Sequence, residues 1–241
     1  EFRRVLFRSN VEQVFITGAD RGVGFALCEQ FAMHGYQVLA GQYMPEWKAL
    51  EGLREKYPDQ VTCITLDVGN TESVKDAVRR TADICSKVDI LVNCAGIIRD
   101  DTREGFRSTL NTNTVGTLRV TELFLPLMEN GKKRLCFFSS EAGSMSMLHR
   151  TGDGDSSYCT SKAALNMCVR LLFNELQPKG YTFRLYHPGW VRSYMAGDEK
   201  AVRGRYEPEE SAQAAYRQFT SSRDYEDALI MTDIKGELWP F

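Results

Sequence analysis

The sequence predicts an α/β fold in which one domain is built around a doubly wound parallel sheet with helices on both faces. Three observations indicate this fold. Short apolar runs alternate with segments of helical periodicity, which is typical of βαβ units. The first apolar run leads into a glycine-rich turn. No stretch rich in proline, glycine or serine divides the 241 residues, so we expect a single domain over 10–241.

The elements are predicted in chain order. A short apolar strand over 11–17 is followed by a helix over 25–34, which Gly35 ends. Further apolar runs predict strands at 36–41, 61–66, 90–92, 135–138 and 183–186. Helical periodicity predicts helices at 71–86, 118–128, 157–176 and 209–219. The apolar side chains of 137–138 and 171–173 are expected in the core.

The composition excludes several functional classes. With 30 Lys plus Arg against 32 Asp plus Glu, the net charge of −2 argues against nucleic acid or an anionic membrane surface as a partner. The sequence contains no run of 18 apolar residues, the length that a transmembrane helix needs. The seven cysteines are scattered without a C-x-x-C pair, and the three histidines have no metal-ligand spacing. We therefore expect a cytoplasmic protein with reduced thiols and no metal site.

Residues 1–9, EFRRVLFRS, differ from the rest of the chain. They lack an initial methionine, carry three arginines and match the translation of the end of a widely used short-read sequencing adapter. No apolar signal core follows them, which argues against a targeting arm. We expect a non-native, adapter-derived segment that has replaced the natural start of the chain before Asn10.

The segment 17–24, TGADRGVG, joins the first strand to the first helix. One glycine permits the bend, a second lets the backbone approach a pyrophosphate, and a third lets helix and strand pack closely. The helix N-terminus adds N–H groups and a partial positive charge. An ordinary tight βα connection is the alternative, and Asp20 is also a candidate cap for the helix. The position in a βαβ unit favours a dinucleotide site formed by Gly18, Asp20, Arg21, Gly22, Val23 and Gly24.

The end of the second strand bears on the choice of cofactor. Dinucleotide sites often place an acid there to bind the ribose hydroxyls, but Gln42 and Tyr43 carry no carboxylate. Arg21 could instead meet a ribose 2′-phosphate through a charge-assisted fork. Both features favour NADP(H). NAD(H) stays an alternative, since Arg21 could equally be a solvated loop charge.

Tyr158 and Lys162 are four positions apart in a strongly patterned helix, so they share one helical face. A phenol has a pKa of about 10 and is a poor acid–base catalyst at neutral pH. A nearby ammonium lowers that pKa and makes proton transfer feasible. Taken alone, such a pair is more often a coincidence of the surface than a site.

Seven motifs in order give the chain a specific resemblance. They are Gly18, Gly22 and Gly24; Asp67-Val68; the tetrapeptide NCAG at 93–96; Asn113 in NTVG; Ser139-Ser140; Tyr158-x-x-x-Lys162; and PGWVRS at 188–193. From residue 11 to the C-terminus the chain resembles the short-chain dehydrogenase/reductase family. It is most similar to the carbonyl-reductase branch related to C-factor and sniffer. The resemblance implies a Rossmann-like sheet of about seven parallel strands.

The resemblance also implies an NAD(P)-dependent oxidoreductase that interconverts a carbonyl and an alcohol by hydride transfer on a small-molecule substrate. Tyr158 would be the proton donor or acceptor, and Lys162 would lower its pKa and bind the nicotinamide ribose. Ser140 would bind the substrate carbonyl, and Asn113 would support a water-linked proton relay. The implied cofactor contacts are Asp67 and Val68 at the adenine, Asn93, Ala95 and Gly96 at the ribose, and Pro188, Gly189, Val191 and Ser193 over the nicotinamide. A homodimer or homotetramer is implied as well.

Some positions depart from the family pattern or stay open. Cys94 replaces a common Asn, with little expected effect. Ser140 and Tyr158 are 18 positions apart, so Ser139 and Ser144 compete with Ser140. The extra residues, 148–155, are polar and suggest a substrate-side loop. His187 is expected to be a packed residue. Apolar side chains at 190 and 194–195 would line a substrate pocket or belong to a helix over the sheet.

Two other functions are alternatives to an NAD(P)-dependent oxidoreductase. A catalytically silent dinucleotide-binding module would sense redox state or serve as a structural partner, but it would not need the Ser/Tyr/Lys/Asn set. An epimerase or dehydratase acting on a nucleotide sugar would keep the fold, but such relatives carry a larger C-terminal substrate domain than the residues after Ser193 could form.

Overall fold

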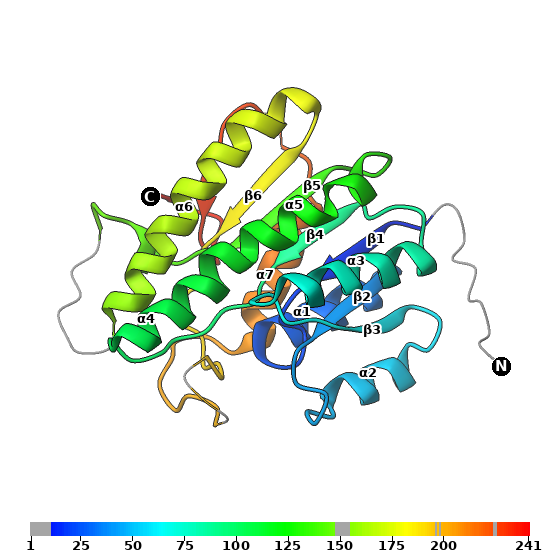
Figure 1. The fold of residues 1–241 in the computed structure, drawn as a ribbon, viewed down its shortest axis with the longest axis horizontal. Coiled ribbons are helices and arrows are strands. Elements are labelled where there is room, and N and C mark those ends of the chain that lie inside the picture. Colours follow the sequence, from blue (N-terminus) through cyan, green and yellow to red (C-terminus); the bar gives the residue numbers. More distant parts are fainter. Residues whose placement is uncertain (1–10, 148–154, 196, 198, 224–225) are drawn as a thin grey trace.

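One sheet organises the chain (Figure 1). The computed structural model describes residues 11–147, 155–195, 197, 199–223 and 226–241, so the segment 1–9 and the loop residues 148–154 lie outside the described residues. The strands lie in the order β3-β2-β1-β4-β5-β6-β7-β8. Their bounds are β1 Gln13–Ile16, β2 Gln37–Gln42, β3 Val61–Thr65, β4 Ile90–Asn93, β5 Arg134–Phe138, β6 Thr182–Tyr186, β7 Met231–Thr232 and β8 Leu238–Trp239.

The doubly wound sheet is confirmed, with one difference at its edge. Strands β1 to β7 are parallel, whereas β8 pairs antiparallel with β7 through Met231↔Trp239 and Thr232↔Leu238. Strands β7 and β8 are two residues long each, and so short a run has no periodicity from which a strand could be predicted.

Among the described residues, seven α-helices connect the strands. Their bounds are α1 Gly22–Met33, α2 Ala49–Lys56, α3 Thr71–Ile84, α4 Arg103–Leu110, α5 Thr117–Met128, α6 Ser156–Leu176 and α7 Pro208–Thr220. A π-helical turn, η1 (Asn111–Gly116), joins α4 to α5, and a 3₁₀ turn, η2 (Glu141–Gly143), follows β5. The sequence prediction missed α2 and α4, which have eight residues each. Within the described part of the chain, no helix combines the length and the apolar character needed to cross a membrane.

The sheet separates two hydrophobic cores. Phe15 of β1 faces the side covered by α3, α5 and α6, whereas its neighbours Val14 and Ile16 face the side covered by α1, α2 and α7. This alternation is expected for strands buried on both faces. The prediction that 171–173 are core is wrong for Leu171, which is 60% exposed because it lies on the outer face of α6.

Strand order reverses between β1 and β4, because β2 lies on one side of β1 and β4 on the other. In open parallel sheets, ligands bind at such a switch point, beyond the carboxyl ends of the strands. The loops that follow β1 and β4 meet there, and Thr17 N–H donates to the Val92 carbonyl at 3.0 Å. This edge positions the candidate site.

Candidate active site

The glycine turn after β1 has the backbone that the sequence predicts. Gly18 and Gly22 have φ values of +66° and +61°, in the left-handed region that favours glycine. A Cβ atom at Gly18 would lie 2.7 Å from the Ala95 Cα, and one at Gly24 would collide with the Gly18 carbonyl. Helix α1 begins at Gly22 without a side-chain cap or an acidic residue in its first turn. The cradle and these N–H groups fit a pyrophosphate.

Thr17 joins this turn to the loop after β4, a contact that the sequence reading missed. Its buried hydroxyl accepts hydrogen bonds from the N–H groups of Cys94 and Ala95, each at 3.0 Å. The signal that could have revealed it is a threonine between a buried apolar strand and a glycine turn. The bonds bring the cofactor candidates of 93–96 against Gly18.

Asp20 does not cap α1, which corrects the expected role. Its carboxylate reaches across to the end of β2 and accepts from the N–H of Tyr43 at 3.0 Å and of Met44 at 2.8 Å. Since Asp20 is only 5% exposed, these are buried charge-assisted hydrogen bonds. Asp20 therefore holds the segment that contains Gln42 and Tyr43 beside the glycine turn, with the Tyr43 side chain exposed.

Arg21 lies between two aromatic rings. Its guanidinium carbon is 4.8 Å from the centroid of the Trp47 ring and 5.3 Å from that of Tyr194. One guanidinium nitrogen also donates to the Tyr194 carbonyl at 3.2 Å. These contacts link the glycine turn, the loop after β2 and the chain after β6, so Arg21 is not a loop charge surrounded by water.

The remaining adenine and ribose candidates lie along the same edge. The Asp67 carboxylate accepts from the Gly69 N–H at 2.8 Å, which fixes the turn after β3 that also contains the buried Val68. Asn93 donates from its amide to the Thr121 hydroxyl at 3.2 Å. Its buried amide oxygen has no hydrogen-bond partner in the described part of the chain.

Tyr158 and Lys162 share one face of α6, as predicted. Both side chains are buried, and the Lys162 Nζ lies 5.7 Å from the centroid of the Tyr158 ring. The ammonium donates to the Phe138 carbonyl at the end of β5, at 2.8 Å. Burial lowers the pKa of Lys162 to about 8, although the nearby Cys94 thiol opposes this shift. The side chain thus stays largely charged at neutral pH inside the protein.

Asn113 lies in the π-helical turn η1, and such turns often occur at functional sites. Its amide donates to the Ile97 carbonyl at 2.9 Å and to the Ser161 hydroxyl at 3.0 Å, and its oxygen accepts from the Ile97 N–H at 2.8 Å. A Cβ atom at Gly96 would lie 3.5 Å from this oxygen and 3.9 Å from the Lys162 Nζ. Asn113 and Lys162 therefore flank Gly96.

The three candidate serines have different surroundings. Ser139 donates its hydroxyl to Asn166 Oδ1 at 2.6 Å, and Ser144 lies beside Ser146. The Ser140 oxygen accepts from the Ala142 N–H at 3.1 Å. Within the described residues its hydroxyl hydrogen has no acceptor. Ser139 is thus already committed as a donor, whereas Ser140 could donate a hydrogen bond to a ligand without breaking an existing one.

The segment 188–195 returns across the carboxyl edge of the sheet. Gly189 has φ +77°, and the Met195 carbonyl accepts from the Ile98 N–H at 3.1 Å, so this segment contacts the loop after β4. Val191 pairs with Tyr206 in an isolated bridge, and the Ser193 carbonyl accepts from Ala201. The helix considered for 190 and 194–195 is not formed, since the chain here is irregular.

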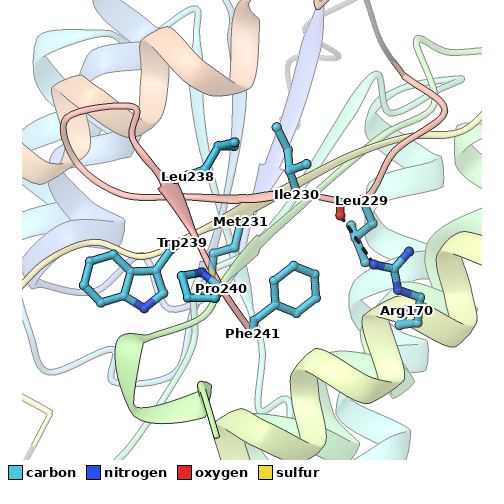
Figure 2. Close-up of a pocket in the computed structure, with 8 residues that line it drawn as sticks. All are labelled: Arg170, Leu229, Ile230, Met231, Leu238, Trp239, Pro240 and Phe241. Carbon is cyan, nitrogen blue, oxygen red and sulfur yellow. Dashed lines mark hydrogen bonds between the residues drawn. The ribbon is translucent and has the colours of Figure 1, made fainter. Parts of the chain in front are cut away.

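A cavity of about 480 Å³ lies elsewhere, beside the C-terminal strands (Figure 2). Arg170 of α6 lines it together with apolar side chains from 229–231 and 238–241. Arg170 follows Lys162 by about two helical turns, so the cavity is separate from the Tyr158–Lys162 pair.

Comparisons with known proteins agree with this geometry. The family model for short chain dehydrogenase matches residues 12–203. An uncharacterised oxidoreductase of Schizosaccharomyces pombe is 32% identical over 193 residues, covering 76% of this chain and 75% of that protein. A second oxidoreductase of that yeast is 31% identical over 229 residues, covering 91% and 89%. Human retinol dehydrogenase 16 is 31% identical and covers 83% of this chain, which spans 63% of that protein.

Solved structures share the fold. The NADPH-bound carbonyl reductase from chicken fatty liver has a TM-score of 0.83 at 26% identity, covering 96% of this chain and 99% of that one. The carbonyl reductase Sniffer of D. melanogaster has a TM-score of 0.82 at 22% identity, covering 96% and 100%, which shows a common fold. As its motifs predict, the chain belongs to the short-chain dehydrogenase/reductase family of oxidoreductases.

Proposed function

We propose that this chain interconverts a carbonyl and an alcohol on a small molecule with NADP(H), and that Tyr158 is the proton donor or acceptor. The observation that carries the proposal is the buried Lys162 ammonium, 5.7 Å from the Tyr158 ring centroid. A positive charge at this distance in a site of low dielectric favours the phenolate and lowers the phenol pKa from its ordinary value of about 10. The phenol can then exchange a proton with a substrate oxygen at neutral pH.

Ser140 and Asn113 complete the proposed proton-transfer site. The Ser140 hydroxyl would donate to the substrate carbonyl oxygen and stabilise the negative charge that develops on it. Asn113 would hold the loop after β4 through its pair of hydrogen bonds to Ile97, which keeps Gly96 beside Lys162. The nearness of Asn113 and Lys162 to the same glycine supports the water-linked relay implied by the family resemblance.

The glycine turn and the start of α1 would bind the cofactor pyrophosphate, with Asp67, Val68, Asn93 and Ala95 around the adenosine half. The segment with Pro188, Gly189, Val191 and Ser193 would cover the nicotinamide, which when bound supplies or accepts the hydride. Two features support NADP(H): Gln42 and Tyr43, at the end of β2, carry no carboxylate, and Arg21 is held near that strand end by Trp47. The chicken carbonyl reductase, which has NADPH bound, is similar in fold over nearly its whole length.

The cofactor proposal is tested by fluorescence titration of the protein with NADPH and NADH. We expect Arg21→Ala to weaken NADPH binding about tenfold or more and to leave NADH binding unchanged, because only NADPH offers a 2′-phosphate to the guanidinium. Arg80→Ala, on the exposed face of α3, is the control for loss of one positive charge. Equal weakening of both cofactors, or tight NADH binding that is indifferent to Arg21, would contradict the NADP(H) preference.

Catalysis is tested with NADPH and a panel of aliphatic aldehydes, aromatic aldehydes, ketones and quinones. We expect Tyr158→Phe to lower kcat about a thousandfold while NADPH binding stays intact, since a single proton-transfer group contributes at about this level. Tyr57→Phe, at the end of α2, is the matched control. A wild-type protein that binds NADPH but reduces nothing in the panel would favour the silent dinucleotide-binding module.

A further inference from the structure

His187 lies at the carboxyl end of β6, directly before the segment proposed to cover the nicotinamide. Its side chain is 6% exposed, and its ring centroid is 5.1 Å from that of Trp239, one of the residues around the cavity in Figure 2. Its backbone N–H donates to the Thr232 carbonyl at 2.8 Å. Strands β7 and β8 thus fix both the backbone and the ring of His187.

The His187 ring contacts the residue that follows Ser140. Its Nδ1 atom accepts a hydrogen bond from the Glu141 N–H at 3.2 Å, so Nδ1 carries no proton in this arrangement. Its Nε2 atom lies 4.0 Å from a carboxylate oxygen of the same Glu141. One imidazole therefore faces both the backbone and the side chain of Glu141.

This hydrogen bond lies just beyond the paired ends of β5 and β6. The regular pairing reaches Phe138↔Tyr186, and the Ser139 N–H still donates to the Tyr186 carbonyl at 2.8 Å. Two residues later the Glu141 N–H donates to a side chain, His187 Nδ1, in place of a carbonyl. Ser140 lies between these two bonds, which hold the backbone on either side of it.

We propose that His187 is a positioning residue that holds Ser140 for the substrate carbonyl by accepting the Glu141 N–H. The proposal rests on the proposed function, because it assigns Ser140 to the substrate oxygen. Ser140 is anchored on its other side by the Ala142 N–H. Losing the His187 acceptor would let the turn η2 move and would misplace the hydroxyl, and a displacement near 1 Å can cost about a hundredfold in rate.

The test compares two substitutions that differ in the acceptor. His187→Phe keeps an aromatic ring against Trp239 but removes Nδ1, whereas His187→Asn places an amide oxygen near the position of Nδ1. We expect His187→Phe to lower kcat about 10- to 100-fold at unchanged NADPH affinity and His187→Asn to restore most of it. His34→Phe, an exposed histidine on α1's C-terminal side, is the control.

Two further measurements separate positioning from general damage. Amide hydrogen exchange at Glu141 should accelerate about tenfold in His187→Phe and recover in His187→Asn, whether or not a substrate is known. In a double-mutant cycle, His187→Phe should have no further effect on kcat once Ser140 is changed to Ala, because it acts through that hydroxyl. Effects that multiply, or unchanged exchange at Glu141, would overturn the role of His187.

The outcomes also distinguish this inference from the proposed function. If the wild-type protein reduces carbonyl probes and the effects of the two substitutions multiply, the role of His187 fails and the proposed activity stands. If the wild-type protein binds NADPH but reduces none of the panel, the proposed activity fails, and the catalytic role of His187 fails with it, even where the exchange data show the hydrogen bond.

Discussion

The edge beyond β1 and β4 and the edge beyond β5 and β6 form the two halves of the proposed site, but they are built differently. The first half is made of backbone: left-handed glycines, an uncapped helix start, and N–H groups held by Thr17 and Asp20. The second is made of side chains that reach across elements, such as Lys162 to the end of β5. Added atoms should damage the first half, whereas removed polar atoms should damage the second.

The largest expected effect lies in the second half. Lys162→Met keeps the length of the side chain but removes its charge, and we expect kcat to fall about a thousandfold because the Tyr158 pKa returns toward its ordinary value. Assays of carbonyl reduction at saturating NADPH measure this loss. If Lys162→Met kept most of the activity, the ammonium would not be needed for catalysis, and the claim that the second half depends on its polar side chains would be wrong.

The same variant should be more stable. Burial lowers the Lys162 pKa from 10.5 to about 8, so below pH 8 the folded protein bears the cost of a buried charge. We expect Lys162→Met to raise the free energy of unfolding at pH 7 by about 2 kcal/mol. The difference in free energy of unfolding between the variant and the wild type should shrink as the pH rises from 8 to 10.5. In this range Lys162 is deprotonated in the folded wild-type protein but still protonated in the unfolded chain, so the wild-type protein gains stability. Urea unfolding at several pH values measures it.

Added atoms test the first half. Gly18→Ala should cost about 2 to 4 kcal/mol of stability and weaken NADPH binding more than about tenfold, because a Cβ meets the Ala95 backbone. Gly35→Ala is the matched control, since Gly35 also has a positive φ, +84°, but no atom lies within 4 Å of its added Cβ. It should cost about 1 kcal/mol and leave binding intact. Equal effects at both positions would mean that conformation alone matters.

Asp20 allows a finer test of this comparison, because its side chain holds backbone N–H groups in the first half of the proposed site. Asp20→Ala should destabilise the protein by about 2 kcal/mol and weaken both cofactors alike, as the chain at Tyr43 and Met44 loses two charge-assisted bonds. Asp233 accepts from two N–H groups in the same manner, in the turn after β7. Asp233→Ala should destabilise similarly without any effect on titrations with NADPH or NADH.

Trp47 has the smallest expected effect. Trp47→Leu removes one of the two rings beside Arg21, and we expect the preference for NADPH over NADH to fall about threefold, the level of a partly exposed cation–π contact. Tyr57→Leu removes a comparable contact with Lys56 at the surface and should leave the preference unchanged. If the ratio of NADPH to NADH affinity is unchanged in Trp47→Leu, the Trp47 ring does not contribute to the cofactor preference.

The same division decides what the sequence could predict. The glycine turn, the Tyr158–Lys162 spacing and the main strands are local patterns, and the structure has them where the sequence places them. The partners of Asp20, Arg21 and His187 lie 23 to 173 positions away in the chain. No periodicity encodes such pairings, so Asp20 was expected to cap its own helix.

Where secondary structure was missed, the local signal was weak. Strands β7 and β8 have two residues each, and they form because β6 already offers an edge for pairing. Leu171 belongs to an apolar run that looks like core, but the turn of α6 places its neighbours Leu172 and Phe173 inward. Tertiary context decides both cases.

The π-helical turn η1 makes the site sensitive to chain length as well as to residue type. An α-helix that loses one residue rotates everything beyond the deletion by about 100°. A π turn differs, because it holds one residue more than the α-helical turn it replaces: a one-residue deletion that regularised η1 would leave α4 and α5 in register but would swing the Asn113 amide away from Ile97. An active variant must therefore preserve the number of residues in η1 as well as the identity of Asn113.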